Sequence, residues 1–560
     1  MEYKVMMPAA IWQGYDPNAE ALEVETKGTE ETVSGITRSV YVYTALTAED
    51  GKVRVQTEVF RGEQADNASP VVLIVQEYHR PPEREFLEAL AKEGYIVVVP
   101  DISHVAPDTL TEFPKSLSYG EFARAGDHIR KVLPTAKETC QYLYSLIVKR
   151  AVTFIKRNIS DGKLVLMGMG DAVEVEIQVA GSGCECDAVA CLNGAGYREY
   201  IRRNRYGGDS EEIVMDEERM CWLTGVASVA YAKYVKAPTF IALGSNARRS
   251  DIDRLSNLKA LLTADSVHIV ISPRAGDFLL PEAYESLLIW LHAAVSGTTA
   301  ELPDIPDIDL RVNEDGRPYF DVDCDTASMI KDVHVFYACK DYNHEVRDWK
   351  EADCLTVSYN EYLASAESYD EKEPLFAFAS VEYENGFTLS SIVAYAELKG
   401  LNVKPSEAKA TGRIVVVYQA GDEESGFVED YDGAVLMHNG LKEVVTSKGM
   451  RGLTSAYGGL RTYHFQAGDD ADNSRILKLE FASDTGCEVT VSLIGISAEG
   501  ATEYAARDRI NATKGLFVAS QFNLSDFKDP LSLKSPTSWS DVRVLVIRGD
   551  NLVVGNILFI

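Results

Sequence analysis

One short stretch of the chain has the local pattern of a turn that presents a nucleophile. Residues 164–172 read LVLMGMGDA, so four apolar residues of strand character run into a turn of small residues. Such a turn needs small residues because its backbone is strained and the next helix packs close to the strand. Gly168 and Ala172 supply the outer small positions, whereas the central position is Gly170, which has no side chain. The stretch therefore predicts the backbone of a nucleophile turn without the nucleophile.

The spacing of cysteine, histidine and acidic residues predicts neither a metal nor a cofactor. Cys184, Cys186 and Cys191 lie close together, but zinc sites usually combine spaced pairs into four ligands, and a fourth is not evident. We interpret these cysteines as small core residues, and the nine scattered cysteines as reduced thiols. An acidic stretch offers the oxygen ligands that calcium prefers, although a solvated loop is the favoured interpretation. Its members are Asp422, Glu423, Glu424, Asp430 and Asp432.

Length and charge limit the class of protein. A chain of 560 residues predicts two to four globular domains. The formal net charge of −31 argues against nucleic acid and anionic membranes as partners and leaves a neutral glycan possible. The longest apolar runs have the length of strands, so no membrane span is expected. Because no secretory signal is evident, we expect a cytoplasmic protein, or an extracellular one if a leader has been removed.

Strands and helices alternate in the first half of the chain. Apolar strands are predicted at 71–75, 95–99, 164–167, 188–192, 239–243 and 268–271. Helices are predicted at 83–92, within 120–157 and at 283–295. This alternation predicts a mostly parallel sheet covered by helices on both faces, preceded by antiparallel strands in the first 60 residues.

The second half of the chain is predicted to consist of β-sandwiches. A linker that contains Pro303 and Pro306 ends the helical region, and a second joint follows at 401–412. The segments 332–339, 374–383 and 390–398 alternate as strands do, and so do 413–420, 475–482, 488–495, 515–527 and 541–560. The predicted domains are therefore residues 1–300, 301–398 and 399–560.

The first domain resembles the α/β-hydrolase fold, and within it the acetyl-xylan-esterase and cephalosporin-deacetylase (dienelactone-hydrolase-like) branch. The resemblance depends on the order and spacing of five segments. They are GYDPNAEALEVE, AKEGYIVVVPDISH, LVLMGMGDAVEVEIQVAG, VKAPTFIALGSNARRSDIDRL and HIVISPRAGDFL with the following helix LLIWLHAAV. The resemblance implies a three-layer α/β domain whose catalytic residues would lie at the ends of the parallel strands.

The resemblance places the catalytic positions of the family on residues that cannot perform the chemistry. The nucleophile position is Gly170, the acid position is Asn246 or Ala247, and the base position is Asp277. The oxyanion loop, usually rich in glycine, reads QEYHRPP at 76–82. Because a Ser-His-Asp mechanism needs all three members together, we predict a pseudoenzyme.

The last domain resembles carbohydrate-binding jelly rolls, and the middle one resembles immunoglobulin-like spacers. Sugar rings stack on exposed aromatic side chains, although aromatic residues in β-sandwiches are commonly core residues. The predicted ligand-binding residues are Tyr78, His79, Tyr457, Tyr463, His464 and Trp539.

Three functions stay open. The first is a catalytically inactive carbohydrate-esterase-like protein that binds carbohydrate or serves as a scaffold. The second is a structural protein that self-assembles, as a homo-oligomer, on the unused hydrolase surface. The third is an active carbohydrate esterase with an unconventional site. Its candidates are Ser182, Ser245 and His79, or Asp171 paired with Asp277.

Overall fold

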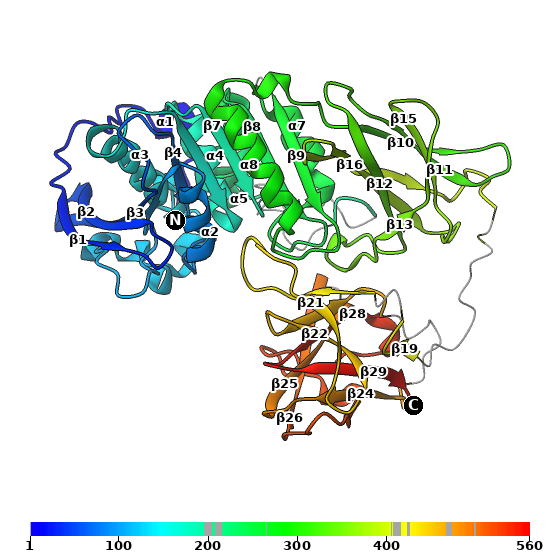
Figure 1. The fold of residues 1–560 in the computed structure, drawn as a ribbon. Coiled ribbons are helices and arrows are strands. Elements are labelled where there is room, and N and C mark those ends of the chain that lie inside the picture. The colour runs from blue at the N-terminus through cyan, green and yellow to red at the C-terminus, as the bar shows by residue number, and fades with distance from the viewer. Residues whose placement is uncertain are drawn as a thin grey trace.

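The computed structural model describes residues 2–194, 204–207, 215–264, 266–404, 406, 416–422, 426–465, 473–497 and 500–560. Its N-terminal domain is built on one nine-stranded sheet in the order β1-β2-β3-β5-β4-β6-β7-β8-β9 (Figure 1). The strands are β1 (Glu25–Glu31), β2 (Thr37–Ala48), β3 (Gly51–Arg61), β4 (Val71–Val75), β5 (Ile96–Pro100), β6 (Leu164–Met169), β7 (Ala188–Leu192), β8 (Thr239–Gly244) and β9 (Val267–Ser272). The first three pair antiparallel, and β4 to β9 pair in parallel.

The predicted strands of this sheet are confirmed, with ends that differ by at most two residues. The central strands β4, β5, β6 and β7 are buried along their whole length, as expected of a parallel sheet with both faces covered. The antiparallel strands alternate between buried and exposed residues in part of β3, because one of their faces meets solvent.

Helices cover both faces of this sheet. The helices are α1 (Pro8–Ile11), α2 (Arg84–Lys92), α3 (Cys140–Asn158), α4 (Val173–Gly181), α5 (Glu217–Gly225), α6 (Ser228–Tyr231), α7 (Leu255–Leu261) and α8 (Pro281–Ser296). Apolar residues of α3, α4 and α7 share one hydrophobic core with the sheet, and those of α2 and α8 share another on its opposite face. The domain therefore has the three layers that were predicted.

The middle domain is a sandwich of two antiparallel sheets. One sheet has the order β10-β11-β15-β14, and the other has β13-β12-β16-β17 with β18 beside β16. Their strands are β10 (Asp307–Val312), β11 (Pro318–Asp323), β12 (Ile330–Cys339), β13 (Lys350–Ala352), β14 (Cys354–Thr356), β15 (Glu361–Ser365), β16 (Pro374–Tyr383), β17 (Thr388–Ser390) and β18 (Ala394–Glu397). The core of this sandwich is continuous with the core below α8, so the two domains pack as one body.

The C-terminal domain is a second antiparallel sandwich, which lies below the other two domains in Figure 1. Its sheets are β21-β22-β29-β24-β27, with β19 beside β29, and β20-β23-β28-β25-β26. Their strands are β19 (Val416–Tyr418), β20 (Phe427–Glu429), β21 (Leu441–Val445), β22 (Arg451–Ser455), β23 (Gly459–Thr462), β24 (Ile476–Ala482), β25 (Cys487–Ser497), β26 (Gly500–Ile510), β27 (Val518–Asn523), β28 (Val542–Arg548) and β29 (Val553–Phe559). Within the described residues, no helix has the length and apolar character needed to cross a membrane.

A buried ion pair joins the first domain to the middle one. Arg347 makes two parallel hydrogen bonds of 2.6 Å each to the carboxylate of Asp253, and both side chains are inaccessible to solvent. The guanidinium also lies 3.4 Å from the ring centre of Phe376 and donates to backbone carbonyls of Asp341 and Tyr342. Every polar group of the pair is thus satisfied inside the domain interface.

Candidate functional site

The candidate site lies where the parallel strands end. The carboxyl ends of parallel strands meet at one edge of a sheet, and loops from that edge usually form the active site of such a domain. Five strand ends contribute a residue each: Glu77 after β4, Gly170 after β6, Asn193 after β7, Asn246 after β8 and Asp277 after β9.

Gly170, the predicted nucleophile position, has a left-handed backbone, and the space beside it is filled. Its φ is +55°, in the left-handed region that residues with side chains rarely adopt. A Cβ atom at this position would lie 2.4 Å from Oε1 of Glu77. The carboxylate of Glu77 therefore lies where the side chain of a nucleophile would begin.

Glu77 is held in this position by arginines. Its side chain is 3% exposed. Nε of Arg80 lies 2.8 Å from one carboxylate oxygen, and Nη1 of Arg249 lies 2.9 Å from the other. These two ion pairs hold the carboxylate of Glu77 in place beside Gly170. The sequence analysis missed Glu77, although its place directly after the oxyanion strand was a signal.

His79 belongs to the same cluster, where it contacts Arg249 and Glu77. Its Nε2 is 3.1 Å from Nη2 of Arg249 and 3.4 Å from the carboxylate of Glu77. Burial, with the charge of Arg249, lowers the pKa of His79 below its usual value. The imidazole is therefore neutral at pH 7 and accepts a hydrogen bond from Nη2 of Arg249. The other guanidinium nitrogen, Nη1, donates to Glu77.

The other predicted catalytic positions have structural roles. The amide of Asn246 donates to the backbone carbonyls of His344 and Arg347, and the carbonyl of Ala247 accepts from the imidazole of His344. The two residues at the predicted acid position, Asn246 and Ala247, therefore bind the middle domain. Asp277 accepts the backbone N–H of Arg249 at 2.9 Å.

Residues 431–437 of the C-terminal domain, here the covering segment, lie over this edge of the sheet. Its Ala434, Val435 and Leu436 are buried. The carbonyl of Ala434 accepts from the side chain of Asn193 at 2.5 Å and from the backbone N–H of Leu279 at 3.0 Å. The N–H of Leu436 donates to the carbonyl of Leu279. The covering segment is therefore paired through its backbone with the loop that follows β9.

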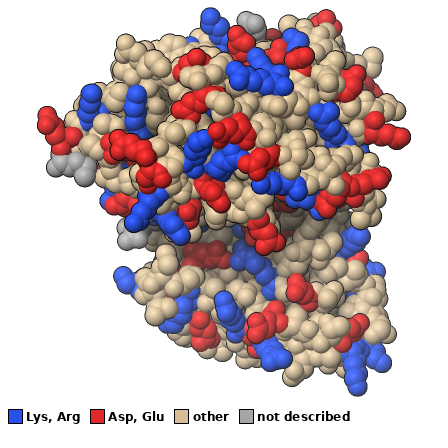
Figure 2. Space-filling view, turned by 90° about the vertical axis from the view of Figure 1, so that its left-hand side faces the viewer, with Lys and Arg blue, Asp and Glu red and all other residues tan. Residues whose placement is uncertain are grey.

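Arg80 ties the covering segment to the Glu77 cluster. Its Nη1 lies 2.8 Å from the carbonyl oxygen and 3.0 Å from the carboxylate of Asp432. What remains open is a cleft of about 410 Å³ between the two domains, lined largely by paired arginines and carboxylates. Figure 2 shows a groove between the upper and lower parts of the molecule, with charged side chains of both signs along it.

The acidic stretch considered for calcium takes part in the wall of this cleft. Although burial opposes it, Arg461 and Arg548 hold the pKa of Asp430 below its usual value. Both carboxylate oxygens of Asp430 are thereby engaged by guanidinium groups, and Asp432 binds Arg80. Glu423 and Glu424 lie outside the described residues.

Three of the predicted ligand-binding aromatic residues belong to the core, which corrects that expectation. Trp539 is fully buried, its indole N–H donates to the carbonyl of Arg475, and its ring meets Phe559 edge to face. Tyr463 and Tyr78 are 2% and 1% exposed. A ring without an exposed face cannot stack on a sugar, and the sequence near these residues carries no signal for what covers them.

The other two predicted residues of the C-terminal domain stay accessible. Tyr457 is 37% exposed and packs edge to face against Tyr431 of the covering segment. Nδ1 of His464 lies 2.7 Å from the carboxylate of Asp348 in the middle domain. His464 therefore contacts a neighbouring domain, and its role as a ligand contact stays a prediction, as does that of Tyr457.

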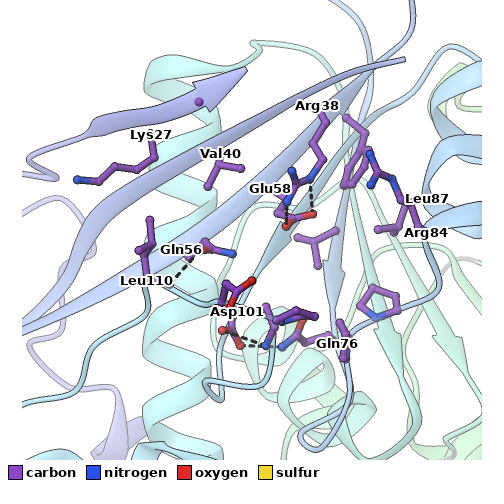
Figure 3. Close-up of a pocket in the computed structure, with 18 residues that line it drawn as sticks. Lys27, Arg38, Val40, Gln56, Glu58, Gln76, Arg84, Leu87, Asp101 and Leu110 are labelled. Carbon is purple, nitrogen blue, oxygen red and sulfur yellow. Dashed lines mark hydrogen bonds and ion pairs between the residues drawn. The ribbon is translucent and has the colours of Figure 1, made fainter. Parts of the chain in front are cut away.

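A larger cavity of about 580 Å³, which was not predicted, lies next to the Glu77 cluster (Figure 3). Its polar wall contains Gln56, the Arg38–Glu58 ion pair, Gln76 and Asp101. Its apolar wall is formed by Val40, Phe60, Pro81, Pro82, Leu87, Val99, Ala106, Pro107 and Leu110. The cavity shares the 76–82 loop with the Glu77 cluster, so the two lie side by side.

Hydrogen bonds fix the amides of this cavity. Gln76 donates to Asp101 at 3.0 Å, and Oε1 of Gln56 accepts the backbone N–H of Leu110 at 2.9 Å. This leaves the amide nitrogen of Gln56 turned toward the interior, as Figure 3 shows. A volume between about 300 and 1,000 Å³ is typical of sites for small molecules.

Among the described residues, one group of side chains lies close enough to share a metal ion, namely Asp251, Asp253 and His344. Both oxygens of Asp253 are bound by Arg347. Nε2 of His344 lies 2.8 and 3.1 Å from the carbonyl oxygens of Ala247 and Ser250 and therefore donates to them. We interpret the group as part of the domain interface.

Comparison with known proteins concerns the fold of the first half of the chain. No protein-family model and no curated protein sequence matches this chain. One similar solved structure is acetyl xylan esterase 1 from Thermoanaerobacterium sp. JW/SL YS485, whose sequence is 11% identical. The match covers 50% of this chain and 89% of the esterase, with a TM-score of 0.38. Acetyl xylan esterase from Paenibacillus sp. R4 is 14% identical, with 50% and 90% covered and a TM-score of 0.38. Glucuronoyl esterase from Solibacter usitatus is 12% identical, with 51% and 91% covered and a TM-score of 0.34.

The predicted fold class is confirmed. The first half of the chain has a mostly parallel sheet covered by helices on both faces, and the second half consists of antiparallel sheets.

Proposed function

We propose that this chain is a non-catalytic, saccharide-binding protein built on an esterase-like fold. The observation that carries the first part is the carboxylate of Glu77, which occupies the place beside Gly170 where a nucleophile would project. The absence of a carboxylic acid at residues 246 and 247 and of a histidine at residue 277 supports the same conclusion. A Ser-His-Asp mechanism has no nucleophile, no base and no orienting acid here.

The cavity at Gln56 and Gln76 supports the second part of the proposal. Saccharides present hydroxyl groups around apolar C–H faces, so their sites combine fixed hydrogen-bonding groups with apolar walls. The amides and the Arg38–Glu58 pair supply donors and acceptors, and Phe60 and the prolines supply the apolar wall. We therefore expect a neutral oligosaccharide of a few units to bind in this cavity.

Restoring a serine at the former nucleophile position is expected to produce no esterase activity. Gly170→Ser, alone or with Asp277→His, places a Cβ atom 2.4 Å from Glu77. A residue with a side chain at this positive φ also costs about 1–2 kcal/mol of stability. Hydrolysis of an aryl acetate and of acetylated xylan, followed for the wild type and both variants, checks this expectation.

Gly126→Ser is the matched control for stability. Gly126 has a φ of +54°, and a Cβ atom there meets nothing within 4 Å. We expect Gly170→Ser to lower the unfolding temperature more than Gly126→Ser does, because only the former displaces Glu77. Ester turnover by the wild-type chain would overturn the non-catalytic part of the proposal.

Filling the cavity is expected to abolish saccharide binding. Val40 lines the cavity on β2, so Val40→Trp places an indole inside it. We expect at least a tenfold loss of affinity for xylo- and gluco-oligosaccharides of two to four units, measured by titration calorimetry. Val33→Trp is the control, because Val33 is fully exposed in the turn before β2. Equal binding by both variants would place the ligand elsewhere.

Self-association is the second candidate function, and an exposed sheet edge favours it. Strand β14 lies at the edge of its sheet, and the apolar side chains of Leu355, Val357 and Tyr359 in and beside it are more than half exposed. Exposed apolar edges are templates for pairing with another chain. Light scattering across a range of concentrations distinguishes an assembling protein from a monomeric binding protein.

A further inference from the structure

A third cavity, on the side of the first domain formed by α3 and the N-terminal segment, contains a buried cation without an anionic partner. Lys149 lies on α3, is 7% exposed and lines a cavity of about 390 Å³. Its ammonium donates to the backbone carbonyl of Ser182 at 3.1 Å and lies 4.6 Å from the ring centre of Trp12. One carbonyl and one ring face are thus its partners among the described residues.

The burial of this ammonium is costly unless something else binds it. An ammonium group has three donors, of which the carbonyl of Ser182 takes one. Burial lowers the pKa of Lys149, and the acidic groups that act on it are the weakly acidic thiols of Cys184 and Cys186. A buried charge is ordinarily paired with an opposite charge, so the remaining donors need an acceptor in the cavity.

Two further cations surround the mouth of this cavity. Lys156 and Arg157 lie on the next turns of α3 and are exposed. Lys156 makes a solvent-exposed ion pair with Glu185, and Arg157 donates to the amide oxygen of Asn18. The three cations and the single carboxylate of Glu185 give the lining a net charge of +2, although the whole chain carries −31.

We propose that this cavity, which we call the Lys149 cavity, binds an organic phosphate of the size of a sugar monophosphate. A phosphate monoester carries a charge of about −1.5 to −2 at pH 7, which matches the lining. Its oxygens accept hydrogen bonds from the free donors of Lys149, and Lys156 and Arg157 neutralise its outer side. The volume exceeds that of a bare phosphate, and the ring of Trp12 supplies an apolar wall for the organic part.

The test compares glucose 6-phosphate, inorganic phosphate and glucose as probes of the full-length chain by titration calorimetry. We expect glucose 6-phosphate to bind at least tenfold more tightly than glucose, with inorganic phosphate as a competitor. The interaction is expected to weaken as salt is added, since it depends on charge. Equal binding of glucose and glucose 6-phosphate would overturn the proposal.

Lys149→Met is the decisive variant. Methionine keeps the length and apolar stem of the side chain while removing the charge, so the variant is expected to fold at least as well as the wild type and to lose binding by tenfold or more. Lys163→Met removes an exposed lysine paired with Asp187 and is expected to leave binding unchanged. If Lys149→Met does not fold, Lys156→Gln with Arg157→Gln, both exposed, is expected to weaken binding several-fold. Unchanged affinity in these variants would contradict the proposal.

This site is separate from the cavity at Gln56 and Gln76. The two cavities share no lining residue. Val40→Trp is therefore expected to leave phosphate binding intact, so that failure of one proposal is distinguishable from failure of the other.

Discussion

Replacing Arg347 by methionine is expected to lower the free energy of unfolding by about 3–5 kcal/mol. The substitution leaves the carboxylate of Asp253 buried without its bidentate partner, at a place where both side chains are inaccessible to solvent. It also removes the stacking of the guanidinium on Phe376 and its hydrogen bonds to two backbone carbonyls. Urea unfolding followed by circular dichroism measures the loss, and limited proteolysis between the first two domains should accelerate.

A double variant separates the ion pair from simple packing. When Asp253→Leu accompanies Arg347→Met, no unpaired charge stays buried, and we expect much of the lost stability to return. Arg311→Met is the control in the same domain, because Arg311 and Asp309 form an ion pair on the surface. Such exposed pairs contribute less than about 1 kcal/mol. An equal loss in the control and in Arg347→Met would show that burial of the pair is not what matters.

Replacing Glu176 by glutamine is expected to remove a loss of stability that the wild type suffers as pH rises. Glu176 lies in α4 and is fully buried against β6 and β7, where Gly168 leaves room for it: a Cβ atom at residue 168 would lie 2.4 Å from its Oε2. Burial raises the pKa of Glu176 well above its usual value. The carboxyl group of the folded protein is therefore protonated under conditions where the unfolded chain is ionised.

The sign of the pH dependence follows from this difference. Below the ordinary pKa of glutamate, both states hold the proton and the contribution to stability is complete. As pH rises toward the raised pKa, the unfolded state gains about 1.4 kcal/mol per pH unit relative to the folded state. Glu176→Gln has no proton to lose, so its stability should exceed that of the wild type by a growing margin above about pH 4.5.

Thermal unfolding at a series of pH values between 4 and 8 checks this expectation. The two proteins are expected to unfold at similar temperatures at the acidic end and to diverge toward neutral pH. Glu63→Gln, in an exposed loop, is the matched control and should follow the wild type. A profile of Glu176→Gln that runs parallel to that of the wild type would mean that the carboxyl group is ionised in the folded protein.

The amino-acid sequence by itself indicated the buried parallel strands, the longer helices and the residue types at the expected catalytic positions. Buried parallel strands such as 71–75 and 188–192 are continuous apolar runs, and helices such as α8 repeat apolar residues on one face, so both types can be identified locally. Gly170 could be placed at a turn between a strand and a helix because the preceding strand, the small residues and the following helix are consecutive in the chain. The residue type at each expected catalytic position is given by the sequence itself and needs no tertiary information.

Only the tertiary structure decided what lies beside Gly170 and which residues are available to a ligand. Glu77, Arg249 and the covering segment come from parts of the chain up to about 350 residues apart, and no local pattern relates them. Trp539 and Tyr463 lie just outside strands, and their burial depends on what packs over them from other parts of the chain. The Arg347–Asp253 ion pair likewise joins residues that are distant in the sequence. The cavity around Lys149 is also formed by residues from separate parts of the chain. Charge and packing act between residues that are distant in the sequence. For that reason the side chains that surround these sites could not be predicted from the sequence alone.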